Sequence, residues 1–329
     1  MYVATIDGGT TNTRACIWRG QCILGEASEA VGVRNAVIDG TKSGLVRAVR
    51  QALRTAAFRA GIPVSEISLI LAAGMLTSSA GLKEIPHAAA PIGLDKLANA
   101  MVCASIPEVA SQPIWFVPGV KNMEDNAVTA ENAAMMDMMR GEEAEAVGLV
   151  SYVNPKGSAI FVLPGSHHKY VLVDERRRIQ KCITTLAGET LRSLTFDTIL
   201  ADTVCRSFAA EFDEEAFLQG AEDGMEHVFL HAAFMTRIRG MFCRYTPLQA
   251  QNYLLGVVLA DDMQALVSAK DWPQWRDALF VVTGKPVMKN AYACLLERRG
   301  QAVVTATDAQ QRGLSGYGAM ELARRRGLL

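Results

Sequence analysis

The sequence predicts an α/β protein of two lobes, each a mixed β-sheet with flanking helices. The first reason is that the chain opens as strand, turn, strand, turn, strand over residues 2–24. The second is that this pattern returns over residues 159–184, as a similarity of pattern rather than of sequence. The third is length, because 329 residues suffice for two domains of ordinary size. We expect the lobes to span residues 1–150 and 151–329.

In the first lobe, short apolar runs separated by turn residues predict strands. These strands are expected at residues 2–6, 13–18, 22–24, 67–71 and 113–117. A helix is expected from Lys42 to Ala60, because apolar residues recur there at three- and four-residue spacings and Gly61 follows. The segments 32–35 and 73–78 are expected to be loops.

The second lobe shows the same kinds of signal. Strands are expected at residues 159–163, 170–173, 179–184, 278–282 and 302–305, with a mostly helical stretch over residues 189–270. A helix is expected over residues 286–299, because Pro286 suits the first position of a helix. A final helix rich in Ala and Gly closes the chain.

Composition excludes several classes of protein. Half the residues are hydrophobic and a fifth are charged, which is typical of a globular protein. The net charge of -1 argues against a nucleic-acid partner. The seven cysteines form no CxxC pair, so we expect reduced thiols, and the five histidines form no metal motif. Without a signal peptide or a membrane span, we expect a cytoplasmic protein with no membrane partner.

The first motif is the segment Asp7–Arg14, a glycine-rich turn between two predicted strands. Gly8 and Gly9 let backbone N–H groups approach a phosphate closely, and the polar side chains of Thr10, Thr11 and Asn12 can bond its oxygens. Asp7 can hold a magnesium ion directly or through water. An ordinary hairpin turn would use the same Asp and Gly residues, but the full combination favours phosphate binding. The motif is neither a Walker A loop nor a dinucleotide-binding fingerprint.

Two segments of the second lobe can also contact a nucleotide. Gly165 and Ser166 lie in the turn that corresponds to the first motif, and His167 and Lys169 add polar and cationic groups. Gly284 ends a predicted strand before a helix, a geometry that suits adenine and ribose. A surface turn and an ordinary strand-to-helix connection are the plain alternatives for these two segments.

A third motif offers a general base. Gly141 precedes Glu142 and Glu143 at the expected start of a helix rich in small residues, and either carboxylate can take a proton from an attacking hydroxyl. Ordinary charge at a helix N-terminus is the alternative. Arg34 and Ser78, in the two predicted loops, are candidates to contact a substrate carboxylate and hydroxyls.

Taken together, these motifs resemble the superfamily of actin, sugar kinases and Hsp70. Within it, almost the whole chain resembles the 2-keto-3-deoxygalactonate kinases (2-dehydro-3-deoxygalactonokinases). The segments that carry this resemblance are 73–75, 117–119, 139–143 and 164–169. The resemblance implies two ribonuclease-H-like, actin-like ATPase lobes with the nucleotide in the cleft between them.

The resemblance also implies an activity, namely ATP-dependent phosphorylation of 2-dehydro-3-deoxy-D-galactonate to its 6-phosphate. ATP and Mg²⁺ are then expected, with Asp7 on the metal, Glu142 or Glu143 as the base, and Arg140 among the groups that bind the sugar acid. A kinase of another keto-deoxy acid or sugar, and an ATPase that acts without a sugar, are the alternatives. A homodimer is left open.

Overall fold

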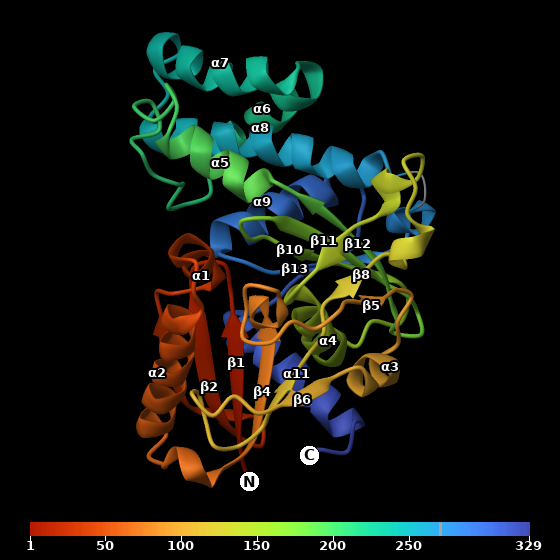
Figure 1. Cartoon of the computed structure of the whole chain (residues 1–329). Helices are drawn as coiled ribbons and strands as arrows, with labels where there is room; N and C mark the ends of the chain where they lie inside the picture. The colour runs from red at the N-terminus through yellow and green to blue at the C-terminus, as the bar shows by residue number, and fades with distance from the viewer. Residues whose placement is uncertain (270–271) are drawn as a thin grey trace. The chain divides into compact units, whose positions relative to one another are not determined.

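The computed structural model describes residues 1–269 and 272–329 (Figure 1). It divides into two compact units that are discontinuous along the chain. The first unit comprises Met1–Lys156, Val173–Cys182 and Ala309–Leu329, and the second comprises Gly157–Leu172 and Ile183–Asp308. The sequence predicted two continuous lobes. It did not anticipate that Ala309–Leu329 would belong to the first unit.

The first unit is built on a six-stranded sheet in the order β3-β2-β1-β4-β7-β6. Its strands are β1 (Tyr2–Gly8), β2 (Thr13–Arg19), β3 (Cys22–Glu29), β4 (Ile67–Gly74), β6 (Val102–Ala104) and β7 (Ile114–Phe116). β2 runs antiparallel to both β1 and β3, while β4 runs parallel to β1 and β7. The predicted strands are thus confirmed, and β1 and β4 extend to the glycines Gly8 and Gly74 at their ends.

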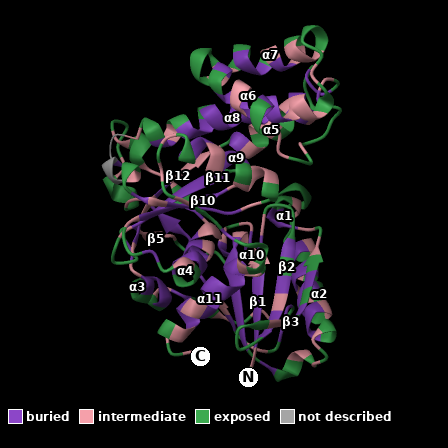
Figure 2. Ribbon diagram, turned by 180° about the vertical axis from the view of Figure 1, so that it is seen from behind, coloured by how far each residue is buried: buried purple, intermediate pink, exposed green. Residues whose placement is uncertain are grey.

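Helices cover both faces of this sheet. They are α1 (Val33–Asp39), α2 (Ser43–Arg59), α3 (Leu94–Asn99), α4 (Glu142–Val153), α10 (Asp308–Gln311) and α11 (Leu314–Arg325). The buried side of α2 shares a core with Ala4 and Ile6 of β1, whereas Gly316 of α11 lies against Thr5. Because neighbouring residues of a strand point to opposite faces, α2 and α11 lie on opposite sides of the sheet. Figure 2 shows the buried residues gathered on the strands and on the inner sides of the helices.

A small three-stranded sheet completes the first unit, in the order β5-β8-β9. Its strands are β5 (Ala88–Ala89), β8 (Val120–Lys121) and β9 (Met138–Met139). Short 3₁₀ turns lie at Val64–Glu66, Met75–Thr77, Asp125–Ala127, Ala133–Met135 and, in the second unit, Pro273–Arg276. The β9 strand ends next to Arg140, which leads into α4.

The second unit contains most of a five-stranded sheet in the order β12-β11-β10-β13-β14, whose residues Val173 and 179–182 are grouped with the first unit. Its strands are β10 (Ala159–Leu163), β11 (His168–Val173), β12 (Ile179–Thr185), β13 (Leu279–Val282) and β14 (Val303–Thr305). β10, β13 and β14 run parallel to one another. These strands confirm the five that the sequence predicted, and their apolar side chains form a core with α6, α8 and α9.

The helices of the second unit are α5 (Ala187–Phe196), α6 (Glu214–Glu226), α7 (Phe229–Phe242), α8 (Pro247–Val267) and α9 (Pro286–Glu297). They confirm the predicted helical stretch up to Val267, and Lys270 lies outside the described residues. α8 begins at a capping box, in which Thr246 and Gln249 satisfy each other's backbone N–H groups, with Pro247 in the first turn. No helix within the described ranges is long and apolar enough to cross a membrane.

One local prediction was wrong. The segment 32–35 was expected to be a loop, but α1 begins at Val33. The side chain of Asn35 accepts a hydrogen bond from the N–H of Gly32 at 3.0 Å, and the N–H of Asn35 donates to the carbonyl of Gly32 at 3.1 Å. This helix has only seven residues, too few for an apolar periodicity to reveal it.

Candidate active site

The Asp7–Arg14 motif forms the hairpin turn between β1 and β2. The N–H of Gly9 donates to the carbonyl of Asn12 at 2.8 Å and closes the turn. The side chains of Thr10, Thr11 and Asn12 are exposed at its tip, and Nδ2 of Asn12 donates to Oγ1 of Thr11 at 3.0 Å. The hydroxyl and amide groups of the turn are therefore accessible, and their predicted contact with phosphate stays a prediction.

The start of α1 lies directly against this turn. The N–H of Val33 donates to the carbonyl of Gly9 at 3.3 Å, and that of Arg34 donates to the carbonyl of Thr10 at 3.0 Å. A Cβ atom at Gly32 would lie 2.5 Å from carbonyl atoms of Gly9 and Thr10, so only glycine fits there. The side chain of Arg34 is exposed, one residue beyond this contact.

Asp7 lies at the end of β1, opposite Arg14 in the antiparallel register. It lines a pocket of about 360 Å³ in the first unit, together with Thr5, Arg14, Glu26, Glu145 and Ser315. Burial raises the pKa of Asp7 to about 6; the charge of Arg14 opposes this shift, and that of Glu142 adds to it. The carboxyl group therefore titrates close to neutral pH, as functional carboxyl groups often do.

Two glycines bring the end of β4 and the start of α4 next to Asp7. Gly74 has a φ of 75°, and a Cβ atom there would lie 2.5 Å from the carbonyl oxygen of Gly8 and 2.9 Å from Oδ1 of Asp7. A Cβ atom at Gly141 would in turn lie 3.2 Å from Cα of Gly74. The missing side chains thus let the backbone before Glu142 approach the carboxyl end of β1.

The two candidate bases have different environments. Glu142 is partly buried, and its Oε2 accepts a hydrogen bond from the N–H of Arg140 at 3.0 Å. Glu143 is fully buried, its Oε2 accepts from the N–H of Gly141 at 2.7 Å, and its Oε1 has no hydrogen-bond partner. Burial, reinforced by the charge of Glu142, raises the pKa of Glu143 well above its ordinary value. Burial therefore disfavours the charged carboxylate of Glu143, which is the form that a general base needs.

Glu145 is a site residue that was not among the predicted ones. It lies in the pocket with Asp7, and burial together with the charge of Asp7 raises its pKa to about 8. The signal that could have found it is its spacing, because residues three apart on a helix share a face and Glu145 follows Glu142 by three. Arg14 was part of the first motif but was not predicted to be a site residue.

The guanidinium group of Arg140 makes several hydrogen bonds within the first unit. Nη1 donates to the carbonyl and hydroxyl oxygens of Thr77 at 2.7 and 2.5 Å, and Nη2 donates to the carbonyl of Ile85 at 3.2 Å and to Nδ1 of His87 at 3.2 Å. Arg140 therefore ties the start of α4 to the segment after β4. Its predicted contact with the substrate stays a prediction.

Ser78 belongs to that same segment after β4. Its hydroxyl group is partly buried and donates to the carbonyl of Met75 at 2.7 Å. The oxygen of a hydroxyl group that donates one bond can still accept another. Ser78 thus remains a candidate to contact a substrate.

In the second unit, Gly165, Ser166 and His167 are exposed in the turn between β10 and β11. The first turn of α5 packs on them, since the N–H of Glu189 donates to the carbonyl of Ser166 at 2.9 Å. A Cβ atom at Gly188 would lie 1.9 Å from the carbonyl oxygen of Gly165. Nε2 of His167 lies 3.3 Å from Oε1 of Glu189. The turn therefore has a fixed shape, which suits a phosphate-binding loop.

Two further predicted residues belong to the second unit. Gly284 follows β13 with a φ of 104°, and a Cβ atom there would lie 3.4 Å from Cγ of Pro164. The predicted adenosine segment and the predicted second phosphate loop therefore adjoin. Lys169 lies within β11, is 6% exposed and donates through Nζ to the hydroxyl of Thr184.

The described residues contain no group of three or more His, Cys, Asp or Glu side chains that could hold a metal ion. Magnesium in kinases needs no such group, because one or two carboxylates share the ion with substrate phosphates and water. Asp7, which lines the pocket in the first unit, offers one such carboxylate.

Comparison with known proteins agrees with this geometry. A sequence model of the 2-keto-3-deoxy-galactonokinase family matches residues 7–317. The 2-dehydro-3-deoxygalactonokinase of Escherichia coli (strain K12) is 25% identical over 286 residues, which make up 86% of this chain and 85% of that protein. A structure from Sinorhizobium meliloti described as a 2-dehydro-3-deoxygalactonokinase superposes with a TM-score of 0.74 at 23% identity, with 98% of each chain covered.

More distant structures share the fold. The activator of 2-hydroxyisocaproyl-CoA dehydratase from Clostridium difficile, with bound ADPNP, has a TM-score of 0.52 at 10% identity and covers 99% of this chain and 96% of its own. A structure from Porphyromonas gingivalis described as an N-acetylglucosamine kinase has a TM-score of 0.51 at 13% identity, over 97% and 99% of the two chains. These likenesses confirm the predicted two-lobed, actin-like ATPase fold.

Proposed function

This chain belongs to the 2-keto-3-deoxy-galactonokinase family, and we propose that it transfers the γ-phosphate of ATP to the 6-hydroxyl group of 2-dehydro-3-deoxy-D-galactonate. It is an ATP-dependent kinase of a sugar acid. The observation that carries the proposal is that residues 7–317, which match the family, include the phosphate turn and the carboxyl groups of Asp7 and Glu142 that adjoin it.

The hairpin turn of the first unit holds phosphate oxygens in this proposal. Its exposed hydroxyl and amide groups, from Thr10, Thr11 and Asn12, are hydrogen-bond donors for an anion. Gly8 is buried, and a Cβ atom there would lie 2.4 Å from Cγ of Leu76, so the partly exposed Gly9 is the glycine proposed to let phosphate approach the backbone. In the second unit, Gly165 and Ser166 bind phosphate in the same way, and Gly284 lies beside the adenosine. Each assignment is supported by the exposure of the turn and by its place at a strand end.

Glu142 is the proposed general base. Its carboxylate accepts the proton of the 6-hydroxyl group as that oxygen forms a bond to the γ-phosphorus. The bond between the γ-phosphorus and the bridging oxygen breaks, and ADP leaves. Glu143 is set aside as the base because its side chain is fully buried, its Oε2 already accepts a hydrogen bond from the N–H of Gly141, and burial raises its pKa.

Asp7 is the proposed ligand of Mg²⁺, which when bound neutralises charge on the phosphates. Asp7 must be ionised for that role, and its pKa of about 6 makes this so at neutral pH. Glu145, with a pKa of about 8, is protonated at neutral pH and can donate a hydrogen bond inside the pocket.

The sugar acid carries a carboxylate and several hydroxyl groups, and its proposed contacts are of matching chemistry. Arg34, exposed beside the phosphate turn, pairs with the carboxylate, while Ser78 bonds a hydroxyl group. His167 and Lys169 of the second unit are further proposed contacts. Arg140 would contact the substrate only by giving up some of its present bonds, so we propose that it mainly holds the segment containing Ser78.

The test is a coupled ADP-release assay over a panel of 2-keto-3-deoxy acids, aldonates and simple sugars. We expect 2-keto-3-deoxygalactonate to give the highest kcat/KM. A better turnover with another acid or sugar would reassign the substrate. ATP hydrolysis that no compound stimulates would replace the kinase proposal with a sugar-independent ATPase.

Two proposals concern the protein's setting. A cytoplasmic location suits a kinase that uses ATP, and cell fractionation tests it. A homodimer is the proposed assembly, and light scattering on the purified chain tests it by giving a mass of either one or two chains.

A further inference from the structure

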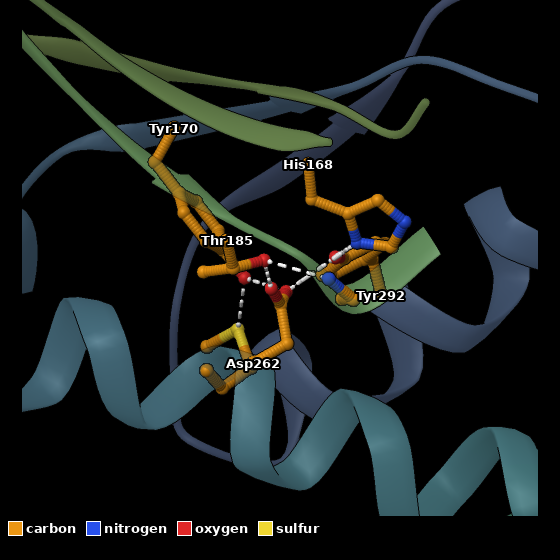
Figure 3. Close-up of polar contacts among 7 residues, drawn as sticks. His168, Tyr170, Thr185, Asp262 and Tyr292 are labelled. Carbon is orange, nitrogen blue, oxygen red and sulfur yellow. Dashed lines mark hydrogen bonds and ion pairs between the residues drawn. The ribbon is translucent and has the colours of Figure 1, made fainter. Parts of the chain in front are cut away.

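The second unit contains a buried polar cluster that the proposed reaction does not use. Its centre is Asp262 of α8, which is 3% exposed (Figure 3). Oδ2 of Asp262 accepts hydrogen bonds from the hydroxyl groups of Tyr170 and Tyr292, each at 2.5 Å, and Oδ1 accepts from the hydroxyl group of Thr185. Nδ1 of His168 lies 3.6 Å from Oδ2 and 2.5 Å from the hydroxyl oxygen of Tyr292.

The hydrogen bonds fix the protonation of the cluster. The hydroxyl group of Tyr292 has one hydrogen, which it donates in the hydrogen bond to Asp262. Nδ1 of His168 must therefore carry a hydrogen and donate it to the oxygen of Tyr292. Burial by itself raises the pKa of Asp262, but hydrogen bonding and charge from His168, with the hydroxyl groups of Thr185 and Tyr170, lower it below its ordinary value. Asp262 is therefore a carboxylate whose oxygens are satisfied by donors.

The donors come from the flanks of the second phosphate loop, Pro164–His167. His168 is the residue that directly follows the loop, and it starts β11. Thr185 ends β12, and its hydroxyl oxygen accepts from the N–H of Ala187 at 3.3 Å, in the first turn of α5. That turn packs on the loop through Gly188 and the N–H of Glu189. Asp262 is thus connected to β11, which follows the loop, and through Thr185 to α5, which packs on the loop.

Tyr292 adds a third tie, because it lies in α9, the helix that follows Gly284. A Cβ atom at Gly284 would lie 3.4 Å from Pro164, so the start of this helix and the phosphate loop adjoin. The residues that meet at Asp262 are far apart in sequence: Tyr170 is 92 residues from it, Thr185 is 77 and Tyr292 is 30. One carboxylate therefore links three segments next to the proposed nucleotide contacts of this unit.

We propose that Asp262 is a positioning residue for ATP, which fixes the shape of the loop Pro164–His167 through His168, Thr185 and Tyr292. The inference rests on the proposed phosphate-binding role of that loop. Buried networks that are fully satisfied make a structure rigid, and a rigid loop binds a ligand without a loss of conformational freedom. Releasing the loop should therefore weaken ATP binding more than it changes contacts with the sugar acid.

The chain offers a matched control. Asp223 of α6 is also a buried carboxylate, and its Oδ2 accepts from the hydroxyl group of Tyr253 at 2.6 Å and from Nη2 of Arg239 at 2.7 Å. Tyr253 and Tyr292 are both fully buried. The Asp223 cluster joins α6, α7 and α8, and in the described part of the chain the side chains of Asp223, Arg239 and Tyr253 form no hydrogen bond with the loop or with its flanking residues. Tyr253→Phe and Tyr292→Phe thus remove similar hydroxyl groups from different places.

The experiment compares Asp262→Asn, Tyr292→Phe and Tyr253→Phe with the unaltered enzyme. We expect Asp262→Asn and Tyr292→Phe to raise the KM for ATP about tenfold, with a smaller rise in the KM for the sugar acid, because His167 is the one loop residue among its proposed contacts. Tyr253→Phe should lower the melting temperature without raising the KM for ATP. The Tyr292→Phe comparison alone decides the matter if Asp262→Asn does not fold.

Binding of a non-hydrolysable ATP analogue, measured by calorimetry without sugar acid, separates this inference from the proposed function. If the unaltered enzyme binds the analogue and Tyr292→Phe binds it equally well, the positioning role of the cluster is wrong and the kinase proposal stands. If the unaltered enzyme does not bind the analogue, the proposed use of ATP is wrong, and the inference falls with it. An equal rise of the ATP KM in Tyr253→Phe would reduce the cluster to a structural role.

Discussion

Glu145 lies in the same pocket as Asp7, and burial together with the charge of Asp7 raises the pKa of Glu145 to about 8. Asp7 itself has a pKa of about 6. Between these two values Asp7 is a carboxylate and Glu145 is protonated, an arrangement in which Glu145 can donate a hydrogen bond and Asp7 can bind a cation. The pH range of the enzyme should follow from this difference.

Activity should fall on the acid side as Asp7 takes up a proton. Below pH 6 we expect kcat/KM for ATP to decrease about tenfold per pH unit, because only ionised Asp7 can hold the metal. Arg14 lowers the pKa of Asp7, so Arg14→Gln should move this limb to higher pH. Profiles of kcat/KM for ATP from pH 5 to 9, for the unaltered enzyme and for Arg14→Gln, measure both effects. If Arg14→Gln does not shift the acid-side decrease, the decrease is not due to Asp7.

Asp7→Asn should abolish turnover and yet stabilise the fold. The pKa of Asp7 is higher in the folded protein, about 6, than in the unfolded chain, near 3.8. The folded protein therefore loses stability as the pH rises from 3.8 to about 6, and the loss is constant above that. At pH 7.5 the variant should be more stable by about 1–3 kcal/mol, and near pH 4 it should gain almost nothing. Urea denaturation at the two pH values checks this. Equal stability of the variant and the unaltered protein at pH 7.5 would mean that burying the charge of Asp7 costs no stability.

Glu142→Gln and Glu143→Gln should behave differently. Loss of a general base typically costs about 10²–10⁴ in rate, so Glu142→Gln should lower kcat by that factor. Glu143 is fully buried, and a glutamine oxygen can accept the same bond from the N–H of Gly141, so Glu143→Gln should keep most of its activity. Steady-state kinetics of the pair decides which carboxylate is the base, and the reverse order would exchange their roles.

Gly74→Ala should disrupt the site by steric overlap. Its Cβ atom would lie 2.5 Å from the carbonyl oxygen of Gly8, and the backbone would also be strained at a φ of 75°. We expect a loss of about 2–4 kcal/mol of stability together with most of the activity. Gly61→Ala is the control, because Gly61 has a φ of 71° with nothing within 4 Å, and strain alone should cost it about 1 kcal/mol. Similar losses in both variants, from thermal melts and assays, would argue against close packing at Gly74.

Much of the fold could be predicted because its signals are local. The strand before Asp7 is a run of apolar residues ended by two glycines, and its hairpin was expected from that pattern alone. The short helix at Val33 was missed, because it shows no apolar periodicity. Hydrogen bonds to the carbonyl groups of Gly9 and Thr10, in the hairpin turn, hold its start in place. Gly32 has to be glycine there for a reason that appears only when the turn and the helix meet.

The site was predictable only in part, for two physical reasons. Successive helical residues point about 100° apart, so the sequence could not tell whether Glu142 or Glu143 faces the core. Asp262 was missed because its partners come from three separate elements, β11, β12 and α9, and no spacing in the sequence relates them. Glu145 shares a face with Glu142, and that spacing was the one signal that was available.

The most direct test of the kinase assignment is the rate of ADP release with and without 2-keto-3-deoxygalactonate, at fixed ATP and Mg²⁺. We expect the sugar acid to raise the rate by at least an order of magnitude, as is usual when an acceptor completes a kinase site, and to become phosphorylated at its 6-hydroxyl group in equal amount to the ADP formed. ADP release that is unchanged by the sugar acid, with no phosphorylated product, would contradict the account.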